Sequence, residues 1–240
     1  MENPLIQSRT VEMIDDGLRR YMIRIFNYMG IGLCLTALTA WITVHTPLIG
    51  MMFNVGADNA VGLSVFGWIV TFAPLFMVFI FMGMLQRSSI GALQLMFWAY
   101  CAVMGLSCAD ILLLYSGASI TRVFLITAAT FGSMSLYGYT TKRDLTNIGS
   151  FLYMGVWGLI IASIVNMFMH SAALYYALSY ISVVIFVGLT AYDMQKLKSL
   201  YYQMGGEEEQ HRVAIAGALN LYIDFINLFL SLLRIMGDRR

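Results

Sequence analysis

Long apolar stretches separated by short polar connectors constrain this chain more than any other feature. A helix needs about 20 mainly apolar residues to cross the hydrocarbon core of a bilayer. Seven stretches of the 240-residue chain meet or approach that length. They cover residues 25–44, 61–85, 90–115, 120–139, 148–169, 174–196 and 213–236. We therefore expect an all-α membrane protein, a bundle of seven transmembrane helices in contact with the lipid bilayer.

Composition excludes several other classes of protein. Hydrophobic residues make up 60% of the chain and charged residues 11%, whereas soluble domains average about 45–50% and 25%. The net charge of +1 leaves no basic block for a nucleic-acid partner. The three cysteines and three histidines follow no disulfide or metal-site spacing, and no soluble-enzyme motif is present. We expect a protein that is not an enzyme and has no cofactor.

The first 20 residues are polar and mixed in charge. We interpret residues 1–20 as a solvated cytoplasmic arm, and residues 21–240 as a single seven-helix transmembrane domain. Asp15 or Asp16 is suited to capping the start of the first helix, because a short acidic side chain accepts hydrogen bonds from the first free backbone N–H groups.

Basic residues predict the orientation, because cytoplasmic connectors carry an excess of lysine and arginine. Ten lie in the arm, at the start of the first span, or in the second, fourth and sixth connectors, whereas the first, third and fifth connectors hold only Arg122. The ten are Arg9, Arg19, Arg20, Arg24, Arg87, Lys142, Arg143, Lys196, Lys198 and Arg212. We expect a cytoplasmic amino terminus. Three tail arginines would then lie outside unless the last helix is re-entrant, and we expect it to cross.

Two aspartates interrupt the last two spans. Asp224 lies mid-span, roughly 17 Å from either end at 1.5 Å per residue, with no basic residue within one turn. An ionised carboxylate at a helix centre costs about 2.5–3.5 kcal/mol, so Asp224 must face the bundle interior and be protonated, paired or hydrated. Asp193 lies nearer the cytoplasmic end, with Lys196 three residues later. It forms either a surface ion pair with Lys196 or an acidic pair with Asp224.

An acidic pair inside the bundle would act as a proton switch. Two carboxyls in a low-dielectric site do not both ionise readily, so they titrate as one unit. With one proton they share a hydrogen bond and hold two helices together. When both are ionised they repel each other and offer hard oxygen ligands to calcium. Elsewhere, Asp110 and Arg122 fall at the outer ends of the third and fourth spans, where a structural ion pair explains both.

The motifs around the two aspartates resemble a known family. The segments GLTAYDMQKLK and GALNLYIDFINLFLSLLRIMGDRR are similar to the carboxy-terminal signature of the Bax inhibitor-1 (transmembrane Bax inhibitor motif) family. The segment MGLSCADILLLYSGASITRVFLITAATFGSMSLYGYTTKRDL resembles its central region, especially in bacterial members. The likeness runs from about Leu18 to the end of the chain.

The resemblance implies a fold and a function. It implies seven helices with the last at the centre of the bundle, in a bacterial inner membrane. It also implies a pH-sensitive calcium leak channel gated by a di-aspartyl pair at Asp193 and Asp224, with calcium as the permeant ion. Bacterial members described as calcium leaks carry an arginine in the second span that latches onto the aspartate of the sixth. Here that span has no basic residue, and Arg87 just beyond it is the candidate latch.

Two other functions remain open at this point. The protein could be a non-conducting regulator that binds other membrane proteins, since some bacterial relatives are linked to a membrane-anchored quality-control protease. Two aspartates on adjacent spans also occur in presenilin-like intramembrane aspartyl proteases. Those enzymes have Gly-x-Gly-Asp at the second aspartate and a later Pro-Ala-Leu stretch, whereas this chain has Leu-Tyr-Ile-Asp and no Pro-Ala-Leu. The protease is therefore the remote alternative.

Overall fold

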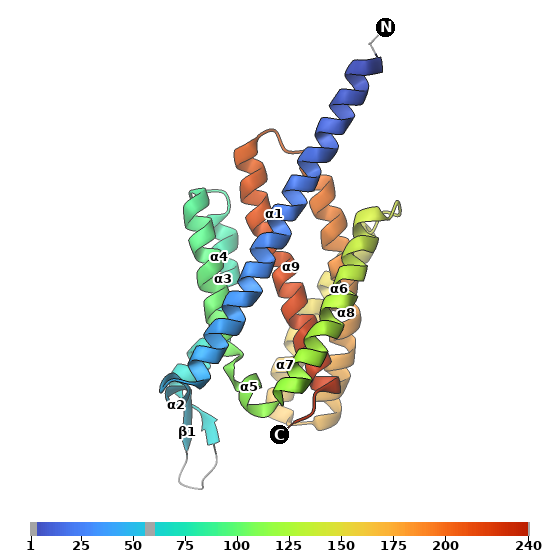
Figure 1. The fold of residues 1–240 in the computed structure, drawn as a ribbon. Helices are drawn as coiled ribbons and strands as arrows, with labels where there is room; N and C mark the ends of the chain where they lie inside the picture. Colours follow the sequence, from blue (N-terminus) through green and yellow to red (C-terminus); the bar gives the residue numbers. More distant parts are fainter. Residues whose placement is uncertain (1–3, 56–60, 240) are drawn as a thin grey trace.

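The computed structural model describes the backbone of residues 4–55 and 61–239 and the side chains of residues 16–54 and 62–239. Over this part of the chain, nine α-helices and one two-stranded antiparallel sheet form (Figure 1). They are α1 (Pro4–Val44), α2 (Leu48–Met52), β1 (Phe53–Val55), β2 (Val61–Leu63), α3 (Val65–Met84), α4 (Ile90–Ser107), α5 (Ala109–Leu114), α6 (Gly117–Thr140), α7 (Thr146–Met169), α8 (Ala172–Tyr201) and α9 (Glu207–Met236).

Seven helical segments of the described chain are long and apolar enough to cross a membrane. The predicted all-α membrane fold is therefore confirmed. One of the seven, Ile90–Leu114, consists of α4 and α5 together and is interrupted at Cys108. In Figure 1 the amino terminus lies at the top with the α3–α4, α6–α7 and α8–α9 connections, and the hairpin and carboxy terminus lie at the bottom. The last helix thus runs the length of the bundle, which is the arrangement expected of a helix that crosses the membrane.

The first helix starts earlier than the sequence predicts. α1 is continuous from Pro4 to Val44 over 41 residues, so the prediction of a helix cap at Asp15 or Asp16 is wrong, because both lie inside the helix. Proline is favoured in the first helical turn, and the polar residues that follow include good helix formers such as glutamate, methionine and arginine. The polar residues of the arm distinguish it from the membrane span in the sequence, but they continue the same helix.

The second span is shorter than predicted. Val61–Leu63 pairs with Phe53–Val55 in an antiparallel hairpin, so the helix begins only at Val65. Ser64 sets this start: its hydroxyl accepts a hydrogen bond from the Gly67 amide at 3.0 Å and donates one to the Met51 carbonyl at 2.5 Å. The apolar residues before Ser64 therefore form a strand at the end of the bundle.

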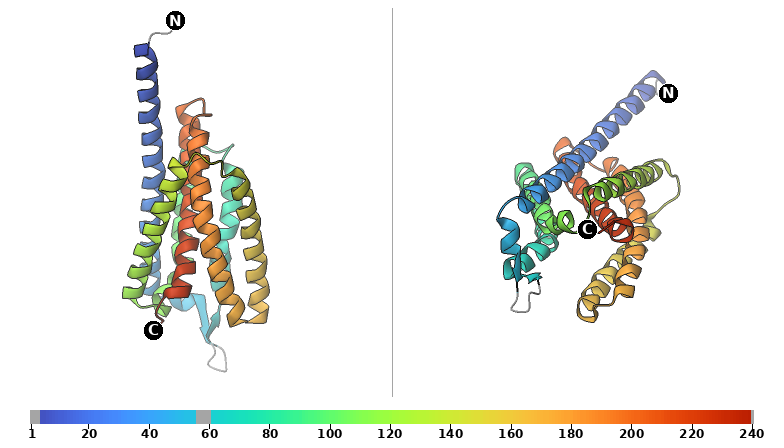
Figure 2. Two further views of the ribbon diagram at one scale, coloured as in Figure 1. Left: turned by 90° about the vertical axis from the view of Figure 1, so that its right-hand side faces the viewer. Right: turned by 60° about the horizontal axis from the view of Figure 1, so that its bottom comes forward.

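α9 is the most enclosed of the seven spans. In its most apolar window 61% of the residues are buried, against 17–28% in the other six. It packs against α1, α4, α6 and α8, and both views in Figure 2 show it with other helices around it. Small residues allow this close approach, since Gly217 of α9 lies directly against Leu197 of α8. α9 carries Asp224 and α8 carries Asp193, the two aspartates within the spans.

Candidate functional site

Asp193 of α8 and Asp224 of α9 lie on the buried stripes of their helices. Each has only 3% of its surface exposed. On α8 the stripe also contains Phe186 and Leu189, seven and four residues before Asp193. On α9 Leu221 and Leu228 occupy equivalent buried positions around Asp224. This spacing matches one face of a helix, so the same pattern that buries the leucines also buries the carboxyls.

The two carboxyl groups meet between α8 and α9. The two side chains lie close enough to interact electrostatically, and a hydrogen bond between two carboxyl groups requires one of them to carry a proton. The Oδ2 atom of Asp224 is buried and has no hydrogen-bond partner among the described residues. A buried polar atom without a partner is costly. A proton or a cation at this oxygen would remove that cost.

Tyr153 of α7 completes the arrangement, and sequence reasoning missed it. Its hydroxyl lies 3.0 Å from Oδ1 and 3.3 Å from Oδ2 of Asp193, and it donates to that carboxyl. Its ring packs edge-on against Tyr192, with ring centroids 6.0 Å apart. The chain holds 14 tyrosines, and nothing in the local sequence distinguishes this one, because the contact bridges 40 residues.

Lys196 does not hold Asp193 in a surface ion pair. Asp193 is buried, and the Lys196 ammonium lies over the ring of Tyr192, 5.8 Å from its centre. The ion pairs among the described side chains are Arg122–Asp238 and Arg212–Glu208. The interpretation of Asp193 as a snorkelling surface residue is therefore wrong.

The structure does not bring Arg87 to the acidic pair. Arg87 is exposed in the turn between α3 and α4. That turn is bound instead by Arg212 of α9, which donates to the backbone oxygens of Leu85 and Ser88. Within the described residues Arg87 has no ion pair with Asp193. Among the described residues no arginine forms an ion pair with Asp193. The Tyr153 hydroxyl donates a hydrogen bond to it instead.

The predicted Asp110–Arg122 ion pair is wrong. Arg122 instead contacts Asp238 of the carboxy-terminal tail at 2.8 Å. The tail folds back against the start of α6, where the Asp238 amide donates to the Ser119 hydroxyl at 2.9 Å. Asp110 interacts electrostatically with Arg234. Local sequence placed Asp110 and Arg122 at the same end of the bundle, but the returning tail supplies the partner of Arg122.

A second polar cluster lies at the opposite end of α9, and the sequence did not reveal it. His211 of α9 lies 3.2 Å from the Tyr28 hydroxyl of α1. Gln94 of α4 donates to that hydroxyl and lies 3.4 Å from the imidazole. These three hydrogen-bonding groups connect α1, α4 and α9 where the predicted cytoplasmic connectors meet.

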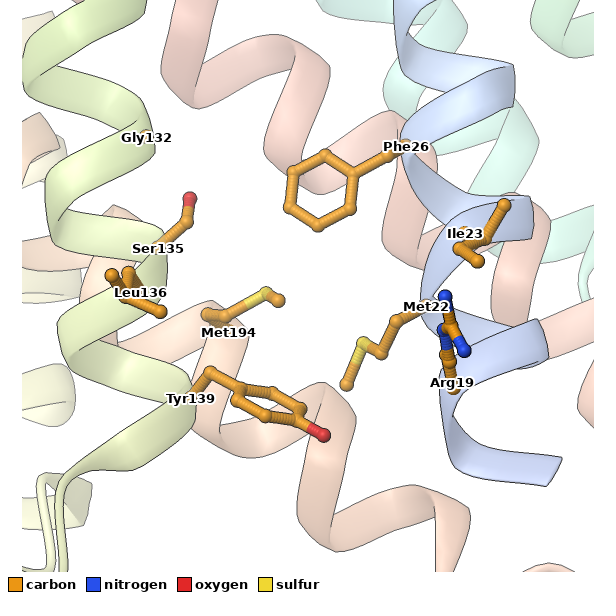
Figure 3. Close-up of a pocket in the computed structure, with 9 residues that line it drawn as sticks. All are labelled: Arg19, Met22, Ile23, Phe26, Gly132, Ser135, Leu136, Tyr139 and Met194. Atoms are coloured by element: carbon orange, nitrogen blue, oxygen red, sulfur yellow. The ribbon is translucent and has the colours of Figure 1, made fainter. Parts of the chain in front are cut away.

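The open space beside the pair is apolar. A hollow of about 360 Å³ separates α1 from α6, with Met22 and Phe26 on one side and Leu136 on the other (Figure 3). Met194, the residue after Asp193, also lines it. Arg19 is the charged residue at its rim. This hollow offers calcium no carboxylate ligands.

The polar side chains at this site are fewer than a dedicated calcium site needs. Within the part of the chain that the structure describes, no three histidine, cysteine, aspartate or glutamate side chains lie together. Calcium takes six to eight oxygen ligands at a dedicated site, whereas Asp193, Asp224 and Tyr153 provide far fewer.

Comparisons with known proteins agree with the fold. The family model described as "Inhibitor of apoptosis-promoting Bax1" matches residues 18–240. The chain is 46% identical to an uncharacterized protein of Rickettsia prowazekii (strain Madrid E), over 94% of this chain and 92% of that protein. It is 42% identical to the inner membrane protein YbhL of Escherichia coli (strain K12), over 93% and 94%. A protein of Caulobacter vibrioides is 41% identical over 95% and 92%.

Proposed function

This chain belongs to the Bax inhibitor-1 family, and from that premise we propose that it is a pH-sensitive calcium leak channel gated by Asp193 and Asp224. The observation that carries the proposal is a buried carboxyl, Asp224, with an oxygen that has no hydrogen-bond partner among the described residues and a second buried carboxyl, Asp193, near it on the neighbouring span. Ionisable groups inside a membrane span are costly, and they commonly mark ion or proton pathways.

The closed state is the one with a single proton between the carboxyls. Tyr153 donates to Asp193, which stabilises Asp193 as the carboxylate. The shared proton then resides on Asp224, whose carboxyl O–H donates a hydrogen bond to Asp193. This chain of hydrogen bonds joins α7, α8 and α9 and keeps the two carboxyls in contact.

Loss of the shared proton opens the path. Two adjacent carboxylates repel each other strongly where water is excluded, and α8 and α9 separate at this level. The freed oxygens are hard ligands that attract a divalent cation. Protonation restores the hydrogen bond, so the same atoms sense pH and bind the permeating ion.

Calcium flux into liposomes containing the purified protein tests this mechanism. Asp224→Asn and Asp193→Asn should each flatten the pH dependence of flux, because an amide cannot titrate. The double variant should add little, since residues that act as one unit are not additive. Asp110→Asn, which changes a span aspartate outside the pair, is the matched control and should keep the wild-type profile.

Two results would contradict the proposal. Independent, additive effects of Asp193→Asn and Asp224→Asn on the pH profile would exclude a coupled pair. A wild-type protein that passes no calcium at any pH would exclude the channel itself and favour the regulator hypothesis.

A further inference from the structure

A hollow of about 290 Å³ lies where the α6–α7 connection meets α8. Three of the side chains that line it are basic: Lys142 and Arg143 from the connection, and Lys196 from α8. All three are exposed. The hollow is separate from the apolar one between α1 and α6, and it has no role in the proposed gating mechanism.

The positive charge of this hollow is not neutralised within the protein. Among the described side chains, Lys142, Arg143 and Lys196 form no ion pair. One acidic residue, Asp144, lines the hollow, but its Oδ1 accepts hydrogen bonds from the backbone amide and hydroxyl of Thr146 at 2.9 and 2.6 Å. The site therefore carries an excess of positive charge and favours an anionic ligand.

The walls of the hollow are held in place before any ligand arrives. Gln195 of α8 donates to the Arg143 carbonyl at 2.7 Å and accepts from the Leu145 amide at 2.9 Å. These two bonds fix the connection against α8. Lys196 lies over the ring of Tyr192, so its ammonium is also oriented. A preformed site loses less conformational entropy on binding.

The position of the hollow identifies the source of the anion. α6 ends at Thr140 and α7 begins at Thr146, so the connection lies at the membrane–water interface. Within the first two turns of α7, Ile148 and Phe151 are 49% and 73% exposed and apolar. A phospholipid would contact both features of this site, because its phosphate meets the basic residues and its acyl chains meet the exposed apolar residues of α7. A soluble phosphate would contact only the basic residues.

We infer that Lys142, Arg143 and Lys196 bind the phosphate headgroup of an anionic phospholipid, whose acyl chains lie along the start of α7. Basic pockets between transmembrane helices at the membrane surface bind such headgroups. The phosphate oxygens accept hydrogen bonds from the two ammonium groups and the guanidinium, and Arg143 binds two of them at once. A bound headgroup would lie one helical turn from Asp193.

Native mass spectrometry of the full chain in detergent tests this site, with dioleoyl-phosphatidylglycerol as the probe and dioleoyl-phosphatidylcholine as the neutral comparison. The variant K142Q/R143Q/K196Q should lose roughly a hundredfold in phosphatidylglycerol affinity, since each basic residue near anionic lipid contributes about fivefold. The matched control R20Q/R24Q/R87Q removes three exposed positive charges from the same end of the molecule, and it should change affinity less than about threefold.

Asp144→Asn provides a test that does not depend on loss of binding. It removes the negative charge in the hollow and keeps an oxygen for Thr146, so phosphatidylglycerol should bind more tightly, by about fivefold. Equal losses in the two triple variants, or no gain with Asp144→Asn, would overturn the site. Displacement of the lipid by equimolar inorganic phosphate would overturn the assignment to a lipid. None of these readouts requires calcium flux.

Discussion

A tyrosine, and not an arginine, is the described residue that binds Asp193 in this structure. The Tyr153 hydroxyl contacts both carboxylate oxygens and is neutral, so it stabilises the carboxylate without adding a charge to the bundle. A hydrogen bond to a charged group is worth about 1.5–3 kcal/mol. In the proposed mechanism, this hydrogen bond favours Asp193 as the carboxylate and therefore places the shared proton on Asp224.

Removal of this hydroxyl should move the pH profile of calcium flux. Tyr153→Phe keeps the ring and its packing on Tyr192 but deletes the donor, so the ionised form of the pair loses stabilisation. Flux should then turn on about one pH unit higher than in the wild type. Tyr180→Phe, on an exposed tyrosine of α8, is the control. An unchanged midpoint in Tyr153→Phe would show that the hydroxyl has no part in gating.

We expect Asp144 to make a small contribution to folding stability that depends on pH. Hydrogen bonds from Thr146 hold the pKa of the Asp144 carboxyl below its usual range. A carboxyl with a depressed folded-state pKa stabilises the protein above its unfolded pKa, near 3.9, and this stabilisation is lost as the pH falls through the folded value. The melting temperature of Asp144→Ala in detergent should therefore be below wild type at pH 7, and the difference should be smaller at pH 3. A constant difference at both pH values would contradict this account.

At the scale of elements, close backbone contact between α6 and α8 positions the acidic pair. Gly138 of α6 lies against the backbone of Ala191, two residues before Asp193. A side-chain carbon at Gly138 would collide with the Ala191 carbonyl oxygen, and backbone atoms cannot move aside as a flexible side chain can. The small residue therefore sets how near α6 lies to the site.

Gly138→Ala should destabilise the protein by about 1–3 kcal/mol, because it forces α6 and α8 apart. Gly132→Ala is a matched control on the same helix, since no atom lies within 4 Å of a carbon added there. That control should be neutral or slightly stabilising, by up to about 1 kcal/mol. Unfolding of both variants in one detergent compares them directly, and equal stabilities would refute the role given to the α6–α8 contact.

At the scale of the whole molecule, the start of α1 and the end of α9 lie at opposite ends of the bundle, as an odd number of membrane crossings would require (Figure 1). Two of the three tail arginines, whose charge conflicts with the bias of the other basic residues, have aromatic partners at their end of the bundle. Arg239 lies over the Tyr115 ring and Arg234 over the Tyr175 ring, 6.0 and 5.7 Å from the ring centres. These aromatic contacts account for positive charge at the end predicted to be external.

Cysteine labelling in intact cells measures the predicted orientation. In a background without Cys34, Cys101 and Cys108, a single cysteine at Lys142 should resist a membrane-impermeant reagent, and one at Asp238 should react. Inverted vesicles should reverse the result. The control is a cysteine at exposed Gly62 of β2, which should react like Asp238. Asn59, in the same connector, lies outside the described residues. Strong labelling at Lys142 in intact cells would overturn the cytoplasmic assignment of the amino terminus.

Whereas only the structure showed that Asp193 is buried, sequence alone determined the number of spans, the all-α class, the family and the burial of Asp224. Each of these follows from short segments, because the free energy of moving an apolar helix or a carboxyl into a bilayer depends mainly on the residues of that helix. The same local rules failed where polarity and helix formation diverge, as in the early start of α1 and the strand before Ser64.

Only the tertiary structure decided which residues meet. Tyr153 reaches Asp193 across 40 residues, Asp238 reaches Arg122 across 116, and Arg212 reaches Leu85 across 127. Such contacts depend on how far each helix is rotated and shifted against its neighbours. Glycines such as Gly138 and the returning tail set those positions, and one helix's own periodicity carries no information about the residue that another helix presents to it.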